Sequence, residues 1–232
     1  MANKKNELKK KEGSALASLT QDELEEERER TQKSGDIRPA RLRIQKESLK
    51  FEDPNTGEIF EELIATIIDH RPPKAFWEVE PGAPLGRLPA CSSADGVRGF
   101  DREEQKWIKC VTCPRNRFGS AGAGKACKEM RWLFLALKDK PLPYLLSLPP
   151  TSIRNFQGYL TGLLNSGIPN PVFVQTLVRL EKATSQGGYA FARVTFERGE
   201  GISYDEYKLR KEQRGQLETA LPSIEIVEED YT

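Results

Sequence analysis

All four cysteines of this 232-residue chain lie between Cys91 and Cys127, with the spacing Cys-x18-Cys-x2-Cys-x13-Cys. Cys110 and Cys113 can supply two thiolates from one tight turn. The Gly- and Ser-rich flanking segments allow the outer two cysteines to return to the same point. Four thiolates suit a tetrahedral zinc ion with no open coordination position. The spacing therefore predicts a structural zinc site made of Cys91, Cys110, Cys113 and Cys127.

Other uses of the four cysteines stay open. Two disulfides would suit a secreted chain, but no apolar segment of a secretory signal follows the Lys-rich N-terminus. A redox Cys-x-x-Cys would leave Cys91 and Cys127 without a role, whereas an iron–sulfur cluster also takes four thiolates. The only histidine, His70, lies well upstream, which disfavours a catalytic zinc. A site of three cysteines and His70 stays an alternative.

The composition indicates a soluble chain whose charge is segregated along its length. It is 31% charged and 37% hydrophobic, with a formal net charge of only +1. No apolar run approaches the roughly 18 residues that a membrane span needs. Seven bases and one acid lie between Lys106 and Arg131, whereas four acids and no base lie between Ile224 and the C-terminus. The length suggests one domain with tails or two small domains.

Residues 1–40 are rich in Lys, Glu and Arg and poor in apolar residues. We therefore expect a charged, flexible N-terminal arm. Thr20 and Glu23 have the spacing of a capping box, so a solvent-exposed helix over residues 15–30 is compatible with this arm.

From residue 42 the hydrophobic pattern predicts mainly β structure. The segment from Asp53 to Gly57 is a dense turn signal, and the β-branched residues after it favour a hairpin. Ile59, Leu63 and Ile67 also have helical spacing, so periodicity alone does not decide. Further strands are predicted at residues 74–79, 131–137 and 144–148.

One amphipathic helix is predicted to follow. It begins at Thr151 or Ser152 as N-cap and ends before Gly167. A hairpin with strands at residues 172–181 and 189–197 comes next, and residues 203–215 are compatible with another helix.

This order of elements matches the second half of a five-stranded OB barrel, where a helix precedes the last two strands. We therefore predict a mainly β (α+β) fold with an OB-like domain over residues 41–200. A zinc-binding insertion is expected at residues 81–128 and a charged segment with an acidic tail at residues 201–232. Another α+β domain with a zinc knuckle is the alternative.

Several short motifs resemble those of a family of phage and prophage proteins. They are Pro89-Ala90-Cys91-Ser92-Ser93-Ala94-Asp95-Gly96, Cys110-Val111-Thr112-Cys113-Pro114, Phe118-Gly119-Ser120, Gly124-Lys125-Ala126-Cys127-Lys128 and Leu148-Pro149-Pro150-Thr151-Ser152. The family is similar to the single-stranded DNA-binding proteins of phage replication and recombination, and the resemblance covers residues 45–200. It implies a zinc-bearing OB fold, single-stranded DNA as the partner, and the cytoplasm of a bacterial host. The acidic end, Glu228-Glu229-Asp230-Tyr231-Thr232, is similar to tails that recruit replication or recombination proteins, although it lacks their common terminal Phe.

Sequence-tolerant binding of a single strand needs cations for the phosphates and exposed aromatic rings for the bases. Candidates in or beside the cysteine window are Lys106, Trp107, Lys109, Arg115, Arg117, Phe118, Lys125, Lys128 and Arg131. Candidates elsewhere are Trp77, Tyr189, Phe191 and Arg193, the last three on one face of the final hairpin. For each residue an ordinary surface or core role is the alternative.

The sequence contains no convincing catalytic motif. The segment from Gly119 to Lys125 resembles a P-loop, but Ala126 stands where the motif needs a Ser or Thr for magnesium. The acidic residues do not have the paired-carboxylate spacing that would indicate a nuclease centre. We therefore expect a non-enzymatic single-stranded DNA-binding protein with structural zinc, whose acidic tail recruits partners or inhibits binding. A zinc-scaffolded protein-interaction module, such as a phage adaptor or inhibitor, is the alternative.

Overall fold

The computed structural model describes residues 19–34, 38–78, 88–138, 140–184, 187–188, 190–221 and 224–227. The chain forms two compact units, Met1–Ile37 and Arg38–Thr232. No helix in these ranges is long and apolar enough to cross a membrane.

The first unit contains one described helix, α2 (Gln21–Ser34). It begins with a reciprocal capping box. The Thr20 amide donates to Glu23 Oε2 at 2.7 Å, and the Glu23 amide donates to Thr20 Oγ1 at 3.3 Å. The box satisfies two helix N-terminal donors, which confirms the predicted cap. Most of the predicted arm lies outside the described residues.

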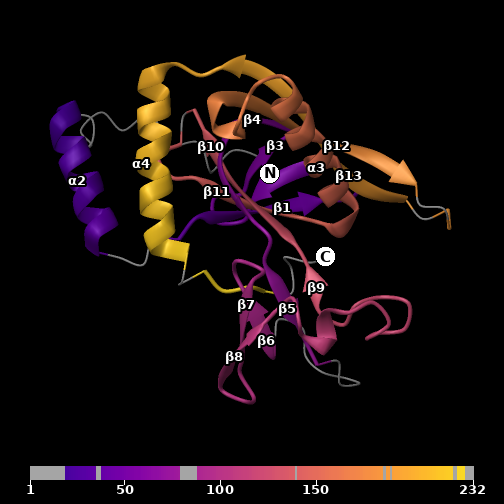
Figure 1. Cartoon of the computed structure of the whole chain (residues 1–232). Coiled ribbons are helices and arrows are strands. Elements are labelled where there is room, and N and C mark those ends of the chain that lie inside the picture. Colours follow the sequence, from indigo (N-terminus) through magenta and orange to yellow (C-terminus); the bar gives the residue numbers. More distant parts are fainter. Residues whose placement is uncertain are drawn as a thin grey trace, which may run out of the picture. The chain divides into compact units, whose positions relative to one another are not determined.

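The second unit is mainly β, as predicted, and is dominated by an eight-stranded sheet that curls into a half-barrel (Figure 1). The strand order is β13-β12-β4-β10-β11-β1-β2-β3. Among the described strands, only β1 and β11 pair in parallel. The strands are β1 (Ala40–Gln45), β2 (Lys50–Asp53), β3 (Glu58–Phe60), β4 (Glu62–Arg71), β10 (Arg131–Leu137), β11 (Tyr144–Leu148), β12 (Val174–Thr184) and β13 (Ala190–Gly201).

Strand β10 lies at the centre of this large sheet and is buried on both faces. Leu133 and Leu135 belong to one core cluster, and Trp132 and Phe134 belong to a second cluster on the other face. A strand covered on both sides needs apolar residues at consecutive positions, which explains why this segment is an unbroken apolar run. The predicted strands at residues 131–137 and 144–148 are confirmed to the residue.

Two helices cover the faces of the large sheet. Phe156 of α3 (Pro150–Asn165) packs in the first core cluster, and Leu217 of α4 (Tyr204–Ala220) packs in the second. The predicted N-cap of α3 is wrong. Pro149 is the cap and Pro150 is the first helical residue, where a missing N–H costs nothing. Short 3-10 helices occur at η2 (Pro114–Asn116) and η3 (Pro171–Phe173).

A second sheet, of five strands, occupies the chain between β4 and β10. We call it the small sheet, and its strand order is β8-β7-β6-β5-β9. Its strands are β5 (Lys74–Phe76), β6 (Cys91–Ser93), β7 (Arg98–Asp101), β8 (Lys106–Lys109) and β9 (Lys128–Glu129). These strands are too short and too polar to show periodicity, so the sequence predicted only β5 among them.

The segment after β13 belongs to the core of the second unit. Ile224 and Ile226 are buried with Leu217 in the second core cluster. The compact unit therefore continues past residue 200, where we had predicted a separate charged segment. The acidic end from residue 228 lies outside the described residues.

Candidate metal centre and nucleic-acid interface

The four cysteines, which we call the cysteine cluster, all line one small cavity of about 10 Å³. Cys91 and Cys110 are buried, Cys113 and Cys127 are half-buried, and none is in a disulfide. Within the described residues, no three His, Cys, Asp or Glu side chains stand in the arrangement of a ready metal ligand set. The cavity thus brings the four predicted ligands together without assembling a finished site.

Backbone hydrogen bonds of the small sheet hold the cysteines around this cavity. Cys91 lies on β6, and the turn after β8 carries Cys110, whose amide donates to Val97 O at 2.9 Å. The Cys127 amide donates to Arg115 O at 2.8 Å, which returns the Gly-rich loop to the cluster.

Gly99 leaves the space that the sulfur atoms need. A Cβ atom at this position would lie 3.0 Å from Cys91 Sγ and 3.7 Å from Cys110 Sγ. A Cβ atom here would therefore press on Cys91 and lie in ordinary contact with Cys110.

Burial disfavours the thiolate form of two members of the cysteine cluster. Burial raises the pKa of Cys91 to about 11, and the Asp101 carboxylate and neighbouring thiols contribute in the same direction. Burial, together with the neighbouring thiols, raises the pKa of Cys127 to about 12. At these two positions a thiolate without a counter-charge is disfavoured, whereas a thiolate bound to a soft cation is balanced.

Several predicted DNA-binding cations already have carboxylate partners. The Arg115 guanidinium donates to Asp101 Oδ2 at 2.9 Å and lies 4.3 Å from the centre of the Phe76 ring. The other ion pairs are Lys106 with Glu104, Lys125 with Glu129 at 2.9 Å, and Arg193 with Glu181. Because a carboxylate already balances each of these cations, we assign them no primary role in binding.

Other predicted residues are partly buried. Trp77 packs against the second core cluster. Arg131 is half-buried, its Nε atom has no hydrogen-bond partner, and burial lowers the pKa of its guanidinium. Lys128 is half-buried on β9. Tyr189 lies outside the described residues.

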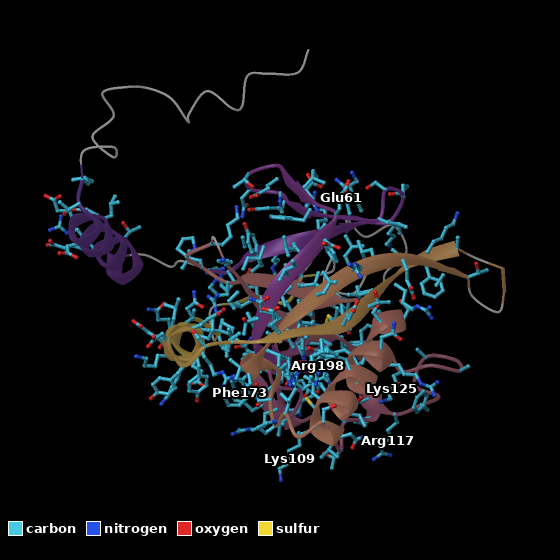
Figure 2. All side chains as sticks on the ribbon, turned by 90° about the horizontal axis from the view of Figure 1, so that it is seen from above. Glu61, Lys109, Arg117, Lys125, Phe173 and Arg198 are labelled. Atoms are coloured by element: carbon cyan, nitrogen blue, oxygen red, sulfur yellow. The ribbon has the colours of Figure 1, made fainter. Side chains whose placement is uncertain are left out.

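Four predicted residues of the cysteine window are open to solvent. Lys109 and Arg117 are exposed and form no ion pair with a carboxylate of the described chain. The Trp107 side chain is 62% exposed and the Phe118 side chain is 81% exposed. Figure 2 shows Lys109 and Arg117 pointing outward on the same side of the view.

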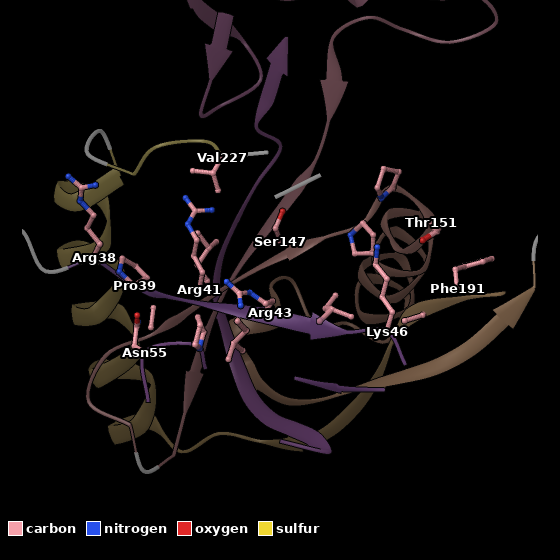
Figure 3. Close-up of a pocket in the computed structure, with 18 of the residues that line it drawn as sticks. Arg38, Pro39, Arg41, Arg43, Lys46, Asn55, Ser147, Thr151, Phe191 and Val227 are labelled. Carbon is pink, nitrogen blue, oxygen red and sulfur yellow. The ribbon is translucent and has the colours of Figure 1, made fainter. Parts of the chain in front are cut away.

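The second unit also contains a groove of about 1050 Å³. It is lined by residues of β1 and β11, the start of α3 and the start of β13 (Figure 3). Its basic side chains are Arg38, Arg41, Arg43 and Lys46, and none of the described residues that line it is acidic. We call it the basic groove.

Among the predicted DNA-binding residues that the structure describes, only Phe191 lines the basic groove, and it is half-buried there. The four groove cations were missed by sequence reasoning. A signal existed, because Arg41 and Arg43 alternate with the apolar Leu42 and Ile44 in a period of two. This pattern predicts a strand with one basic face, but it overlaps the end of the charged arm.

The groove can neutralise several phosphates while offering apolar surface to bases. Arg41 is the most tightly held of its cations, since its guanidinium lies over the Trp132 ring and donates to Glu225 O. Arg38, Arg43 and Lys46 are exposed and form no ion pair with a described carboxylate. They are therefore available to an anionic ligand.

No protein-family model, curated protein or solved structure matches this chain. The resemblance to a phage family therefore stays a prediction, and the function must be argued from the groove and the cysteine cluster.

Proposed function

We propose that this protein binds single-stranded DNA in the basic groove and catalyses no reaction. One observation carries the proposal: four cations and no described carboxylate line a groove of about 1050 Å³. A nucleic acid strand offers the matching charge, and the half-buried Phe191 offers a ring to its bases. A cellular setting in the cytoplasm of a bacterial host is part of the same proposal, through the phage resemblance.

We also propose that the curled sheet is an OB-type barrel that is not fully closed. In support, β4, β10 and β11 form an antiparallel meander, α3 follows β11, and the β12–β13 hairpin pairs with β4 through β12. The outer edge of β11 is taken by β1, in parallel, rather than by β13. The groove lies beside this unclosed seam. In OB folds the loop after the first strand often contacts nucleic acid, and the small sheet is inserted at that point.

The cysteine cluster would hold one structural zinc ion. Its support is the chemistry of the donor set: four thiols line the cavity, and Lys74 is the one other ionisable side chain among its described lining residues. A bound zinc ion would supply the positive charge that lets the thiols ionise, and four thiolates would leave no position for substrate. Cys91, Cys110, Cys113 and Cys127 would thus join β6 to the turn after β8 and to the Gly-rich loop.

The acidic tail is proposed to regulate the groove or to recruit partners. Val227, the last described residue before the tail, lines the groove, and Glu228, Glu229 and Asp230 follow it in the sequence. Charge complementarity would let this segment compete with phosphates.

The test is a fluorescence polarisation titration with labelled single-stranded DNA, single-stranded RNA and duplex DNA. If four phosphates are neutralised, affinity for the single strand should fall about 50-fold between about 50 mM and about 200 mM salt. Arg43→Gln with Lys46→Gln should lower the salt slope by about 1.4. Lys208→Gln with Lys211→Gln on α4 is the matched control and should bind as wild type does.

Salt-insensitive binding, or a preference for duplex, would overturn the proposal. A folded protein that binds none of the three nucleic acids would favour the protein-interaction module instead. Comparison of the two single strands decides between DNA and RNA.

A further inference from the structure

The hairpin formed by β7 and β8 turns one face to the cysteine cluster. Gly99 pairs with Ile108 across the hairpin. A Cβ on Gly99 would lie 3.0 Å from Cys91 Sγ, and Ile108 lines the same cavity as the cysteines. Because successive side chains of a strand point to opposite faces, the neighbouring pairs must lie on the other face.

That outer hairpin face consists of two cross-strand pairs, Arg98 with Lys109 and Phe100 with Trp107. The Phe100 and Trp107 ring centres are 5.4 Å apart, and the Arg98 guanidinium carbon lies 5.5 Å from the centre of the Trp107 ring. Trp107 is nevertheless 62% exposed. A large aromatic side chain exposed to this extent beside cations is the kind of surface on which nucleobases stack.

The cations on this face are unbalanced. Arg98 and Lys109 stand directly opposite each other, and like charges in that relation destabilise a sheet. No carboxylate of the described residues forms an ion pair with either one. On the same strand, Lys106 does have such a partner in Glu104. A phosphate group between Arg98 and Lys109 would relieve this repulsion, and an adjacent base could lie on Trp107.

We infer that the outer hairpin face, formed by Arg98, Phe100, Trp107 and Lys109, is a second contact for single-stranded nucleic acid. The inference rests on the proposed function, because it assigns this face to the same strand that occupies the basic groove. Trp107 is the stacking residue, Phe100 supports its ring, and Arg98 and Lys109 bind phosphate. The cysteine cluster sets the orientation of the hairpin by holding its inner face.

The test compares three variants of the full chain: Trp107→Ala, Trp107→Phe, and Arg98→Gln with Lys109→Gln. Affinity for a labelled single strand of about 30 nucleotides is measured by polarisation, and folding by thermal melting. Trp107→Ala should weaken binding about 5- to 150-fold, whereas Trp107→Phe retains a ring and should weaken it much less. The charge variant should lower the salt slope by about 1.4.

Tyr204 and Lys208 on α4 provide the matched control. The Lys208 Nζ atom lies 5.2 Å from the centre of the Tyr204 ring, and this ring is 74% exposed. Tyr204→Ala and Lys208→Gln therefore remove the same kind of aromatic–cation pair from another element. Both should bind as wild type does.

The outcomes separate this inference from the proposed function. Suppose that the folded Trp107→Ala and charge variants bind as wild type does, while Arg43→Gln with Lys46→Gln weakens binding. This result would overturn the second contact and would still support the basic groove. If the hairpin variants weaken binding and the groove variant does not, the groove is wrong and the hairpin face stands. If the wild-type protein binds no single-stranded nucleic acid, both the proposed function and the second contact are wrong. If Trp107→Ala has a clearly lower melting temperature than wild type, its binding result cannot be used. The charge variant then tests the second contact, because it alters only exposed side chains.

Discussion

The hydroxyl oxygen of Ser152 accepts a hydrogen bond from the Val194 amide at 2.9 Å, joining α3 to the last strand of the large sheet. The Asn155 side chain donates to the Val194 carbonyl at 3.0 Å. Both backbone groups lie in the middle of β13, the end strand of the large sheet, where no further described strand pairs with them. The helix therefore covers part of the sheet edge, and covered edges resist pairing with other chains. The start of β13, just before this contact, forms part of the basic groove.

Ser152→Ala should destabilise the protein. The Ser152 side chain is fully buried, so its loss leaves the Val194 N–H without an acceptor at a cost of about 1–3 kcal/mol. Urea unfolding measures the change. Thr161→Ala removes an exposed hydroxyl from the same helix and should cost less than about 0.5 kcal/mol. Equal stability of the two variants would contradict the role given to Ser152.

Gly99→Ala should damage the small sheet. Its Cβ would lie 3.0 Å from Cys91 Sγ and 3.3 Å from the Ser92 carbonyl oxygen, which costs about 1–3 kcal/mol as overpacking. Thermal melting and metal content report the effect. Gly158→Ala in α3 is the opposite control, because nothing lies within 4 Å of its Cβ. It should stabilise the helix by about 0.5–1 kcal/mol. A Gly99→Ala protein with wild-type stability and metal content would argue against the tight packing at the cluster.

Purified protein should contain one zinc ion per chain, and each single Cys→Ser substitution in the cysteine cluster should reduce that content. Chelation should loosen the small sheet first, because the first core cluster of the large sheet contains no residue of it. Elemental analysis and hydrogen exchange check the two parts. Iron and sulfide with visible absorption would support a cluster instead, and metal-free protein with two disulfides would refute a metal site.

Protonation of His70 should weaken the fold in mild acid. Burial, with help from Arg131, lowers the pKa of His70 below its usual 6.5, and its ring packs 5.3 Å from that of Phe156. Above pH 6.5 the imidazole is neutral in both states, and its contribution is fully present. As the pH falls from 6.5 toward the lowered pKa, only the unfolded chain takes up the proton readily, so stability is lost, by up to about 1.4 kcal/mol per pH unit. Below the lowered pKa the folded protein is protonated as well, and the loss levels off.

The measurement is the free energy of unfolding at about pH 7.5 and about pH 5 for wild type and His70→Phe. Wild type should lose more stability between the two pH values than His70→Phe does. Carboxylate titration affects both proteins alike, so the difference between the two losses reports His70 alone. An identical loss in both proteins would show that His70 does not contribute.

Neutralising the acidic tail should tighten binding. Glu228→Gln, Glu229→Gln and Asp230→Asn remove three charges that follow the groove-lining Val227. The gain in affinity for single-stranded DNA should be several-fold at low salt and should vanish at about 1 M salt, where the Debye length is about 3 Å. Unchanged affinity at low salt would leave only partner recruitment for the tail.

Much of the fold could be predicted, because it is encoded in local patterns. The apolar run at residues 131–137 forms β10, and Thr20 with Glu23 forms the capping box. The turn from Asp53 to Gly57 does form a hairpin, of β2 and β3. Each of these depends on neighbours within a few residues, so the sequence carries the signal directly.

The functional surfaces could be predicted only in part. The sequence placed four cysteines in one window, and the structure shows that they line one cavity. Whether a Lys or Arg side chain is available to bind a phosphate, however, depends on the carboxylates that folding brings close to it. Arg115 forms an ion pair with Asp101, and Arg193 forms one with Glu181. Lys109 and Arg117 form no ion pair with a described carboxylate.

By itself, the sequence determined the mainly β class, the boundaries of its most apolar strands and the grouping of the cysteines. Those properties follow from side-chain periodicity and turn chemistry, which act over short stretches of chain. Only the tertiary structure decided where the basic groove lies. It forms because Ala40 of β1 pairs with Tyr144 of β11 across a long sequence separation, and no local pattern specifies that partner.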